Sequence, residues 1–78
     1  MTFSEAIRKR IEDLCSTKKF TTNKLSTNAG ITNSTISSIL SGKTKVPKAD
    51  TVYYICVGFG ITLKDFYDDK VFDEIDDD

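Results

Sequence analysis

The chain has 78 residues and a formal net charge of −1, and 38% of its residues are hydrophobic. This length corresponds to one small domain, with enough apolar residues for a single core. A chain this short leaves little room for a large enzyme cleft. Its charge excludes a strongly basic protein, which is the simplest electrostatic case for binding nucleic acid.

The two parts of the chain differ in charge. Residues 1–48 contain nine basic and three acidic residues, which give a charge of +6. Residues 49–78 contain two basic and nine acidic residues, which give a charge of −7. Such an asymmetry indicates a part that binds anions and an acidic C-terminal segment.

Cysteine and histidine content argues against a metal site or a disulfide scaffold. The chain has no His, and Cys15 and Cys56 lie 41 residues apart. This is no metal-ligand spacing, so we expect no metal and no cofactor. Both cysteines lie among apolar helical positions, so we expect reduced thiols in or near the core. The apolar, uncharged stretch Thr51–Leu63 has 13 residues and is too short to span a bilayer. With no evident signal peptide, we expect a cytoplasmic protein without membrane contact.

The first predicted helix has one apolar face. Its members are Ala6, Ile7, Ile11 and Leu14, which recur at helical spacing, and Arg10 lies on the same face. We expect Ser4 to be the N-cap. The apolar periodicity stops near residues 16–19, where we expect the helix to end.

The second predicted helix is short and covers Thr22–Ala29, with Thr21 as its N-cap. Gly30 follows it directly. A helix end favours a residue that can adopt a positive φ, so Gly30 marks a turn after this helix.

The third predicted helix covers Asn33–Leu40, begins after Thr32 as N-cap and is ended by Gly42. Its apolar residues are Ile36, Ile39 and Leu40. They are separated by three and four positions rather than two, which favours a helix over a strand.

Two further helices are predicted after the polar loop 41–48, which contains the only proline, Pro47. One covers Ala49–Phe59, and the other covers Leu63–Tyr67 with Thr62 as N-cap. The residues expected to face the core are Val52, Ile55, Cys56, Phe59, Leu63 and Phe66. The sequence therefore predicts an all-α fold of five helices, with a domain at 1–67 and a short acidic C-terminal tail at 68–78.

The segment from Thr21 to Gly42 contains the residues that bear most on function. The third helix carries uncharged polar candidates for reading base edges: Asn33, Ser34, Ser37 and Ser38. A helix fits the major groove, Asn can pair with adenine, and Ser can donate to or accept from several bases. Residues 33–42 include no acidic side chain, and Lys43 and Lys45 follow as candidates for phosphate contact. On composition alone, a solvated helix face and a polar loop explain the same residues.

From Arg10 to Tyr67 the chain resembles the lambda-repressor/Cro-like helix-turn-helix family, also called the Xre family. The motifs that carry the resemblance are Arg10-Ile11-x-x-Leu14, Phe20-Thr21-Thr22-x-x-Leu25-Ser26, Ala29-Gly30-Ile31-Thr32-x-x-Thr35-Ile36-Ser37-x-Ile39, Ser41-Gly42-Lys43 with Pro47, and Ile55-x-x-x-Phe59-Gly60-Ile61-Thr62-Leu63-x-Asp65-Phe66. Each is weak alone, but their ordered spacing holds without a gap over about 58 residues.

The resemblance implies a five-helix DNA-binding domain in which 22–29 is the positioning helix and 33–40 the recognition helix. It implies that Asn33, Ser34 and Ser38 read base edges, with Ser37 facing the rim of the groove. The residues that it implies for phosphate binding are Thr22, Thr32, Ser41, Lys43 and Lys45.

The chain departs from the family pattern at Thr22 and at Leu40. Many members carry Gln where this chain has Thr22, so the side chain available for that phosphate contact is shorter here. Many carry Glu where this chain has Leu40, and that Glu pairs with the arginine of the first helix. Arg10 therefore lacks its usual partner, and two alternatives stay open: a phosphate, or the carboxylates of Glu5 and Asp13.

Two surface features also have two interpretations each. Tyr54 and Val57 stand where the family usually has polar residues. They predict either a partner surface, such as a dimer interface, or packing under the tail through Val71, Phe72 or Ile75. The acidic tail is either a solubilising terminus or a device that weakens non-specific DNA binding.

Together these observations predict a sequence-specific regulator that binds double-stranded DNA. We expect a repressor that binds its operator as a homodimer, and we expect neither enzyme activity nor a small-molecule substrate. The alternative is a protein-interaction module of the same fold, antitoxin-like or an adaptor, with little or no DNA binding.

Overall fold

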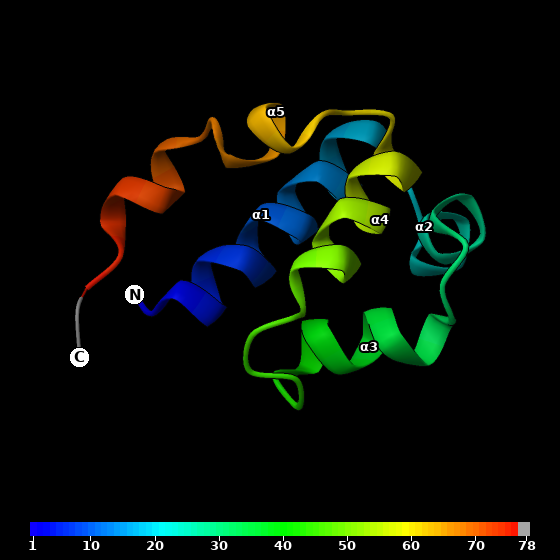
Figure 1. Ribbon diagram of the computed structural model, residues 1–78, viewed down its shortest axis with the longest axis horizontal. Coiled ribbons are helices and arrows are strands. Elements are labelled where there is room, and N and C mark those ends of the chain that lie inside the picture. The colour runs from blue at the N-terminus through cyan, green and yellow to red at the C-terminus, as the bar shows by residue number, and fades with distance from the viewer. Residues whose placement is uncertain (77–78) are drawn as a thin grey trace.

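The computed structural model describes residues 1–76, which contain five α-helices and one short 3₁₀ helix (Figure 1). They are α1 (Phe3–Lys18), α2 (Thr22–Ala29), α3 (Asn33–Ser41), α4 (Ala49–Phe59), α5 (Leu63–Tyr67) and η1 (Lys70–Glu74). No strand occurs within these residues, so the predicted all-α fold is confirmed. Asp77 and Asp78, the last two residues of the predicted acidic tail, lie outside the described residues.

Threonine residues cap the N-termini of most of the helices. The hydroxyls of Thr21, Thr32 and Thr62 each accept a hydrogen bond from a backbone N–H in the first turn of α2, α3 and α5. These contacts satisfy N–H groups that have no partner inside the helix. All three predicted caps are therefore confirmed.

The predicted cap of the first helix is wrong. Thr2, and not Ser4, is the N-cap of α1. Its hydroxyl accepts from the Glu5 N–H at 3.1 Å, and a Glu5 carboxylate oxygen accepts from the Thr2 N–H at 2.8 Å. This reciprocal pair satisfies two backbone donors at once. A cap at Ser4 could not form such a pair, because the residue three positions later, Ile7, is not acidic.

The core lies where α1, α2, α3 and α4 meet. Its largest fully buried side chains are Phe66, Ile7, Ile11, Leu25, Ile36, Ile55 and Cys56. α2 packs closely on α4, because an added Cβ at Gly58 would lie 2.9 Å from the Ala29 Cβ and 3.0 Å from its backbone nitrogen. Gly58 thus permits the close approach of these two helices.

One predicted core residue is exposed. Val52, Ile55, Cys56 and Phe59 are buried as expected, but 41% of the Leu63 surface is accessible. Leu63 is the first residue of α5, and helical side chains point back toward the N-terminus of their helix. Its side chain therefore lies beyond the end of the core, whereas the Phe66 side chain is fully buried in the core.

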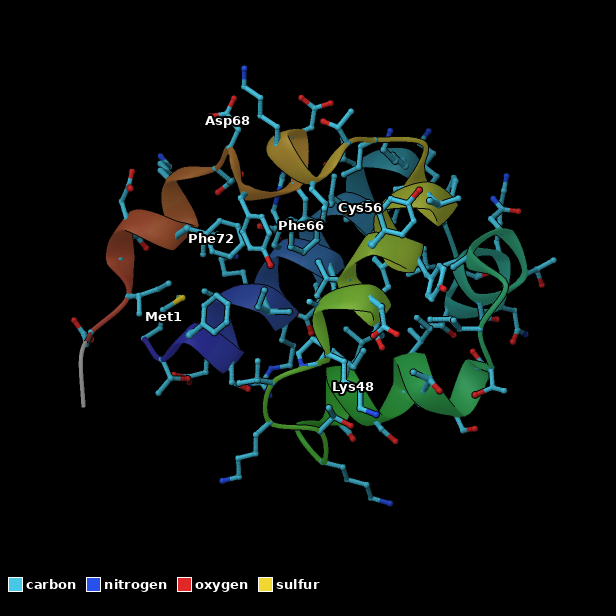
Figure 2. All side chains as sticks on the ribbon, in the orientation of Figure 1. Met1, Lys48, Cys56, Phe66, Asp68 and Phe72 are labelled. Carbon is cyan, nitrogen blue, oxygen red and sulfur yellow. The ribbon has the colours of Figure 1, made fainter. Side chains whose placement is uncertain are left out.

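The segment after α5 packs against α1. Val71 in η1 is buried, and the Phe72 ring lies 5.9 Å from the Phe66 ring and 5.0 Å from the Tyr67 ring, between centroids (Figure 2). At the end of the described chain, the Asp76 N–H donates to the Met1 carbonyl oxygen at 2.8 Å. The segment that the sequence predicts as a tail therefore covers part of the domain up to Asp76.

Arg10 anchors this segment. Its Nε donates to the Phe66 carbonyl oxygen at 2.7 Å, and its Nη2 donates to the Asp65 carbonyl oxygen at 2.8 Å. Its Nη1 pairs with an Asp69 carboxylate oxygen at 3.2 Å. Only 14% of the Arg10 side chain is exposed.

The alternative in which Arg10 pairs with Glu5 or Asp13 is therefore wrong. Glu5 is engaged in the cap of α1, and Asp13 pairs with Lys9 at 3.5 Å. Each of the three guanidinium nitrogens of Arg10 donates a hydrogen bond inside the domain. Its partners lie in α5 and at Asp69, directly before η1.

Candidate nucleic-acid interface

A tight turn fixes α3 relative to α2. Gly30 has a φ of +72° and donates its N–H to the Ser26 and Thr27 carbonyl oxygens, while Ile31 also donates to Ser26. An added Cβ at Gly30 would meet no atom within 4 Å, so only the backbone conformation requires glycine here. The predicted positive φ is confirmed, and with it the helix-turn-helix placement.

α3 presents two different faces. Ile36 and Ile39 point into the core, and Leu40 is half-buried against it. The opposite face exposes Asn33, Ser34, Ser37 and Ser41, while Ser38 is half-buried. The predicted base-facing residues therefore lie together on one helix, although Ser38 is less accessible than the others. The helix is one residue longer than predicted and ends at Ser41.

The segments that surround this face carry no acidic side chain. Residues 14–49 contain no acidic residue and six lysines. This stretch includes all of α2, α3 and the loop that follows α3. An approaching phosphate therefore meets no carboxylate from these elements.

The loop after α3 projects basic side chains. Lys43, Lys45 and Lys48 are exposed (Lys48 is labelled in Figure 2). The Thr44 N–H donates to the Ser38 carbonyl oxygen at 3.0 Å, and Pro47 is buried, so the loop is fixed at both ends. None of the ion pairs within residues 1–76 includes these lysines.

The hydroxyl groups predicted to contact phosphates are partly engaged already. Thr32 accepts from the Thr35 N–H at 3.2 Å, and the Ser41 hydroxyl donates to the Ser38 carbonyl oxygen at 3.3 Å. Thr22 is the first residue of α2 and is half-buried. Phosphate contacts at Thr22 and Thr32 would therefore come chiefly from N–H groups of the helix N-termini.

Arg8 is a candidate that the sequence analysis missed. Its guanidinium lies beside Gly42, where Nη1 would be 2.9 Å from an added Cβ. Arg8 belongs to α1, 34 positions before the glycine, so only the packing of α1 against α3 brings the two together. No periodicity or motif in the sequence connects them.

A separate face on α4 is apolar and exposed. Tyr53, Tyr54 and Val57 are 51%, 44% and 50% exposed, and the two tyrosine rings lie 5.7 Å apart between centroids. Phe72 packs on Phe66 and Tyr67 rather than on Tyr54, and Val71 packs on α1. The predicted alternative, in which the tail covers Tyr54 and Val57, is therefore wrong.

The two cysteines are free thiols. Cys56 is buried in the core and Cys15 is half-buried, and burial raises the pKa of both. Within residues 1–76, no three His, Cys, Asp or Glu side chains are grouped to hold a metal ion. The same part of the chain contains no helix with the length and apolarity needed to cross a membrane.

Comparison with known proteins agrees with this architecture. A family model described as a helix-turn-helix domain matches residues 9–70, which is most of the chain. The match runs from the second turn of α1 to the start of η1. Neither the curated proteins nor the solved structures give a match.

Proposed function

Because the chain belongs to the helix-turn-helix domain family, of the lambda-repressor/Cro-like type, we propose that it is a sequence-specific transcriptional repressor that occupies operator DNA as a homodimer. Family membership supports DNA binding in general. The single observation that carries the finer proposal is the exposed, acid-free face of α3, which a lysine-bearing loop follows.

Base reading is assigned to the exposed face of α3. An α-helix with its side chains is about 10–12 Å across, which suits a major groove about 12 Å wide. Asn33 at its N-terminus supplies both a donor and an acceptor, the combination that recognises adenine. Ser34, Ser37 and Ser38 have shorter reach, so water and DNA shape contribute beside direct contacts.

Phosphate binding is assigned to the ends of the same structure. Lys43 and Lys45 follow the C-terminal end of α3, where the groove wall passes. Thr22, Thr32 and Ser41 lie at helix ends, where N–H groups or hydroxyls contact phosphate oxygens. These contacts set the register of α3 in the groove and do not read sequence.

Dimerisation is assigned to Tyr54 and Val57 on α4. An exposed aromatic and aliphatic pair three residues apart forms one continuous helical patch, and Tyr53 extends it. A two-fold dimer places two recognition helices on half-sites about 34 Å apart. A dimer on such a site represses by blocking access of polymerase to the promoter.

A protein-interaction module of the same fold is the second candidate. The exposed tyrosines on α4 and the net charge of −1 favour it. The two candidates differ in how they respond to salt. Phosphate contacts release counterions, so affinity for random duplex DNA falls steeply with salt only for the DNA-binding protein.

Selection of bound duplexes from a random pool, followed by binding measurements on variants, tests the proposal. Asn33→Ala should weaken the selected site by roughly 1–3 kcal/mol and leave random duplex almost unchanged. Lys43→Ala should weaken both equally and lower the salt slope by about one. Asn28→Ala, which removes an amide from α2 together with its long 3.5 Å hydrogen bond to the Gly58 carbonyl oxygen, is the matched control, and thermal melting verifies that it is folded.

Two results would contradict the proposal. If Asn33→Ala weakens selected and random DNA equally, the base-reading role is wrong. If the parent shows no salt-dependent binding to any duplex, the protein-interaction module is the better description.

A further inference from the structure

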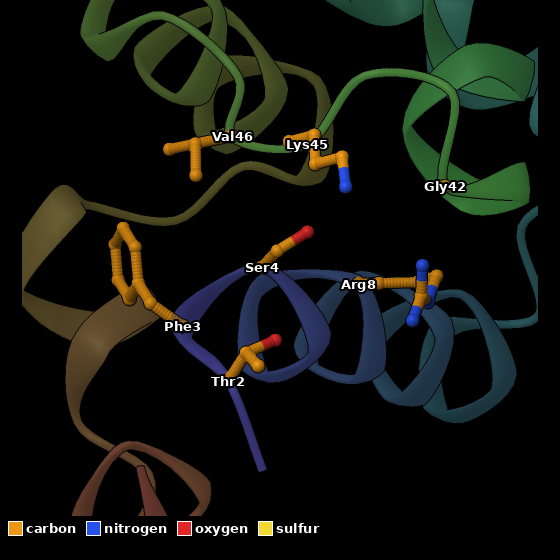
Figure 3. A pocket seen from close by; sticks show the side chains of 7 residues that line it. All are labelled: Thr2, Phe3, Ser4, Arg8, Gly42, Lys45 and Val46. Atoms are coloured by element: carbon orange, nitrogen blue, oxygen red, sulfur yellow. The ribbon is translucent and has the colours of Figure 1, made fainter. Parts of the chain in front are cut away.

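An open pocket of ≈ 500 Å³ lies between the N-terminal part of α1 and the loop after α3 (Figure 3). Ser4 and Arg8 line it from α1, and Gly42, Lys45 and Val46 line it from the other side. The pocket therefore joins two segments that are remote in sequence, and it adjoins the C-terminal end of α3.

Gly42 makes room for the Arg8 guanidinium. An added Cβ at this position would lie 2.9 Å from Arg8 Nη1, which is closer than real contacts of this kind. The guanidinium therefore occupies the space that a side chain at position 42 would take. It stands directly beside the turn that ends the recognition helix.

Neither cation of the pocket forms an ion pair within residues 1–76, although the Arg8 charge is a minor cause of the lowered pKa of Glu5, after the hydrogen bonds from Thr2. Glu5 is the closest acidic residue to Arg8 in the sequence, and its carboxylate is held by the Thr2 N–H in the cap of α1. The ion pairs within residues 1–76 are Met1–Asp76, Lys9–Asp13 and Arg10–Asp69, and none includes Arg8 or Lys45. Two positive charges thus face one open pocket, together with the hydroxyl of Ser4 (Figure 3).

We propose that Arg8 and Lys45 bind one phosphate group of the DNA backbone in this pocket. The inference rests on the proposed function. Arg presents a planar fork of N–H donors that matches phosphate oxygens, and Lys adds a point charge. The site adds a contact from α1 to those from α2, α3 and the loop, on the groove wall next to the end of α3.

Charge-matched variants of the full chain test this assignment. Arg8→Gln and Lys45→Gln each remove one cation from the pocket. Lys9→Gln removes one cation from the neighbouring position of α1, where the side chain pairs with Asp13 instead. Affinity for random duplex is measured by fluorescence anisotropy from 50 to 200 mM salt, and thermal melting verifies that each variant is folded.

Arg8→Gln should weaken random-duplex binding by up to about eightfold at 0.1 M salt and lower the salt slope by about one. The double variant should lower the slope by about two, because each cation releases its own counterion. Arg8→Lys should keep the slope and lose part of the affinity, because it retains charge but not the fork. Lys9→Gln should change the slope much less.

Four results would overturn the assignment. One is an equal slope change for Arg8→Gln and Lys9→Gln while the parent binds DNA, which leaves the proposed function intact. A second is a lower melting temperature for Arg8→Gln with an unchanged slope, which gives Arg8 a structural role. A third is inorganic phosphate binding that Arg8→Gln abolishes without any effect on duplex, which makes the pocket a free-anion site. A parent without duplex binding overturns the proposed function and this inference together.

Discussion

The region 21–48 and the region 49–76 are held in place by different kinds of contact. In the first, threonine caps and the Gly30 turn fix α2 and α3, and the exposed side chains are short and uncharged or are lysines without ion pairs. In the second, the Arg10 guanidinium joins α1 to α5 and to Asp69, and three aromatic rings pack α5 on η1. Charges are used for internal stability in the second region and remain accessible in the first. Stability and recognition are thus assigned to different side chains.

Removal of Arg10 should test the internal role of charge most severely. Arg10→Met keeps an apolar stem and deletes three hydrogen bonds, two of them to backbone carbonyls. We expect a loss of roughly 2–3 kcal/mol in the free energy of unfolding, because hydrogen bonds to charged groups contribute strongly when sheltered from solvent. Chemical denaturation measures it.

The control for this change lies next to it on the helix. Lys9→Met deletes an ion pair whose two side chains are both about half exposed, so it should cost less than about 0.5 kcal/mol. Equal losses for the two variants would remove the distinction between accessible and internal charges.

Gly58 lies where α2 and α4 join the two regions. Helix propensity alone predicts that Gly58→Ala stabilises the protein by about 1 kcal/mol. The structure predicts the opposite sign, because the new Cβ would meet the Ala29 backbone. We expect a net loss of about 1–2 kcal/mol in denaturation experiments, since overpacking outweighs propensity. The same change in an Ala29→Gly background should cost less; a stabilised single variant would show that α2 can move away from α4.

The α4 patch should affect assembly without affecting the fold. Tyr54→Asp places a charge in the proposed dimer surface, and we expect the dimer dissociation constant to rise at least about tenfold. Sedimentation at micromolar concentration measures the dimer fraction, and Tyr54→Phe, which keeps the apolar ring, is the control. A dimer fraction equal to that of the parent would move the interface away from Tyr54.

The smallest expected effect concerns the contact between the chain ends. The Met1 amino group donates to an Asp76 carboxylate oxygen at 2.8 Å. This hydrogen bond raises the pKa of the amino group above its ordinary value of 8.0 and lowers the pKa of Asp76 below 3.8. The amino group's contribution to stability is complete below pH 8 and is lost as pH rises through its raised pKa. That of Asp76 is complete above pH 4 and is lost as pH falls through its lowered pKa.

The stabilising contribution of this contact is therefore largest between about pH 4 and pH 8. In the parent, the melting temperature should fall slightly on both sides of this range. Asp76→Asn should flatten the two flanks and change little else, because both groups are exposed to solvent. An unchanged pH profile in Asp76→Asn would mean that the two ends do not pair in solution.

Local signals made most of the fold predictable. The bounds of α2 and α5 follow from a threonine cap at one end and a glycine or a change of pattern at the other. The start of α4 has no side-chain cap and follows from the polar loop that contains Pro47, and Gly60 marks its end. The cap at Thr2 was also within reach, since Thr2 and Glu5 have the spacing of a capping box. Ser4 also has the side chain of an N-cap residue, but only Thr2 has a reciprocal partner three positions later.

Contacts between remote segments were not predictable in the same way. The partners of Arg10, the closeness of Gly58 to Ala29, and the position of Arg8 beside Gly42 all depend on how helices pack. The sequence suggested local partners for Arg10, because helical spacing reveals only neighbours three or four residues away. The candidate site divides similarly: its α3 face is periodic in sequence, whereas its α1 contribution has no sequence signal.

The division of α3 into buried isoleucines and exposed short side chains has a consequence for how specificity can change. Ser34 and Ser37 are exposed and take no part in the core that Ile36 and Ile39 build. Exchange of these serines for Gln or Arg would alter what the helix reads while the scaffold stays the same. Under the proposed function, one or two substitutions at these positions would change the preferred operator and leave the core that Ile36 and Ile39 build intact.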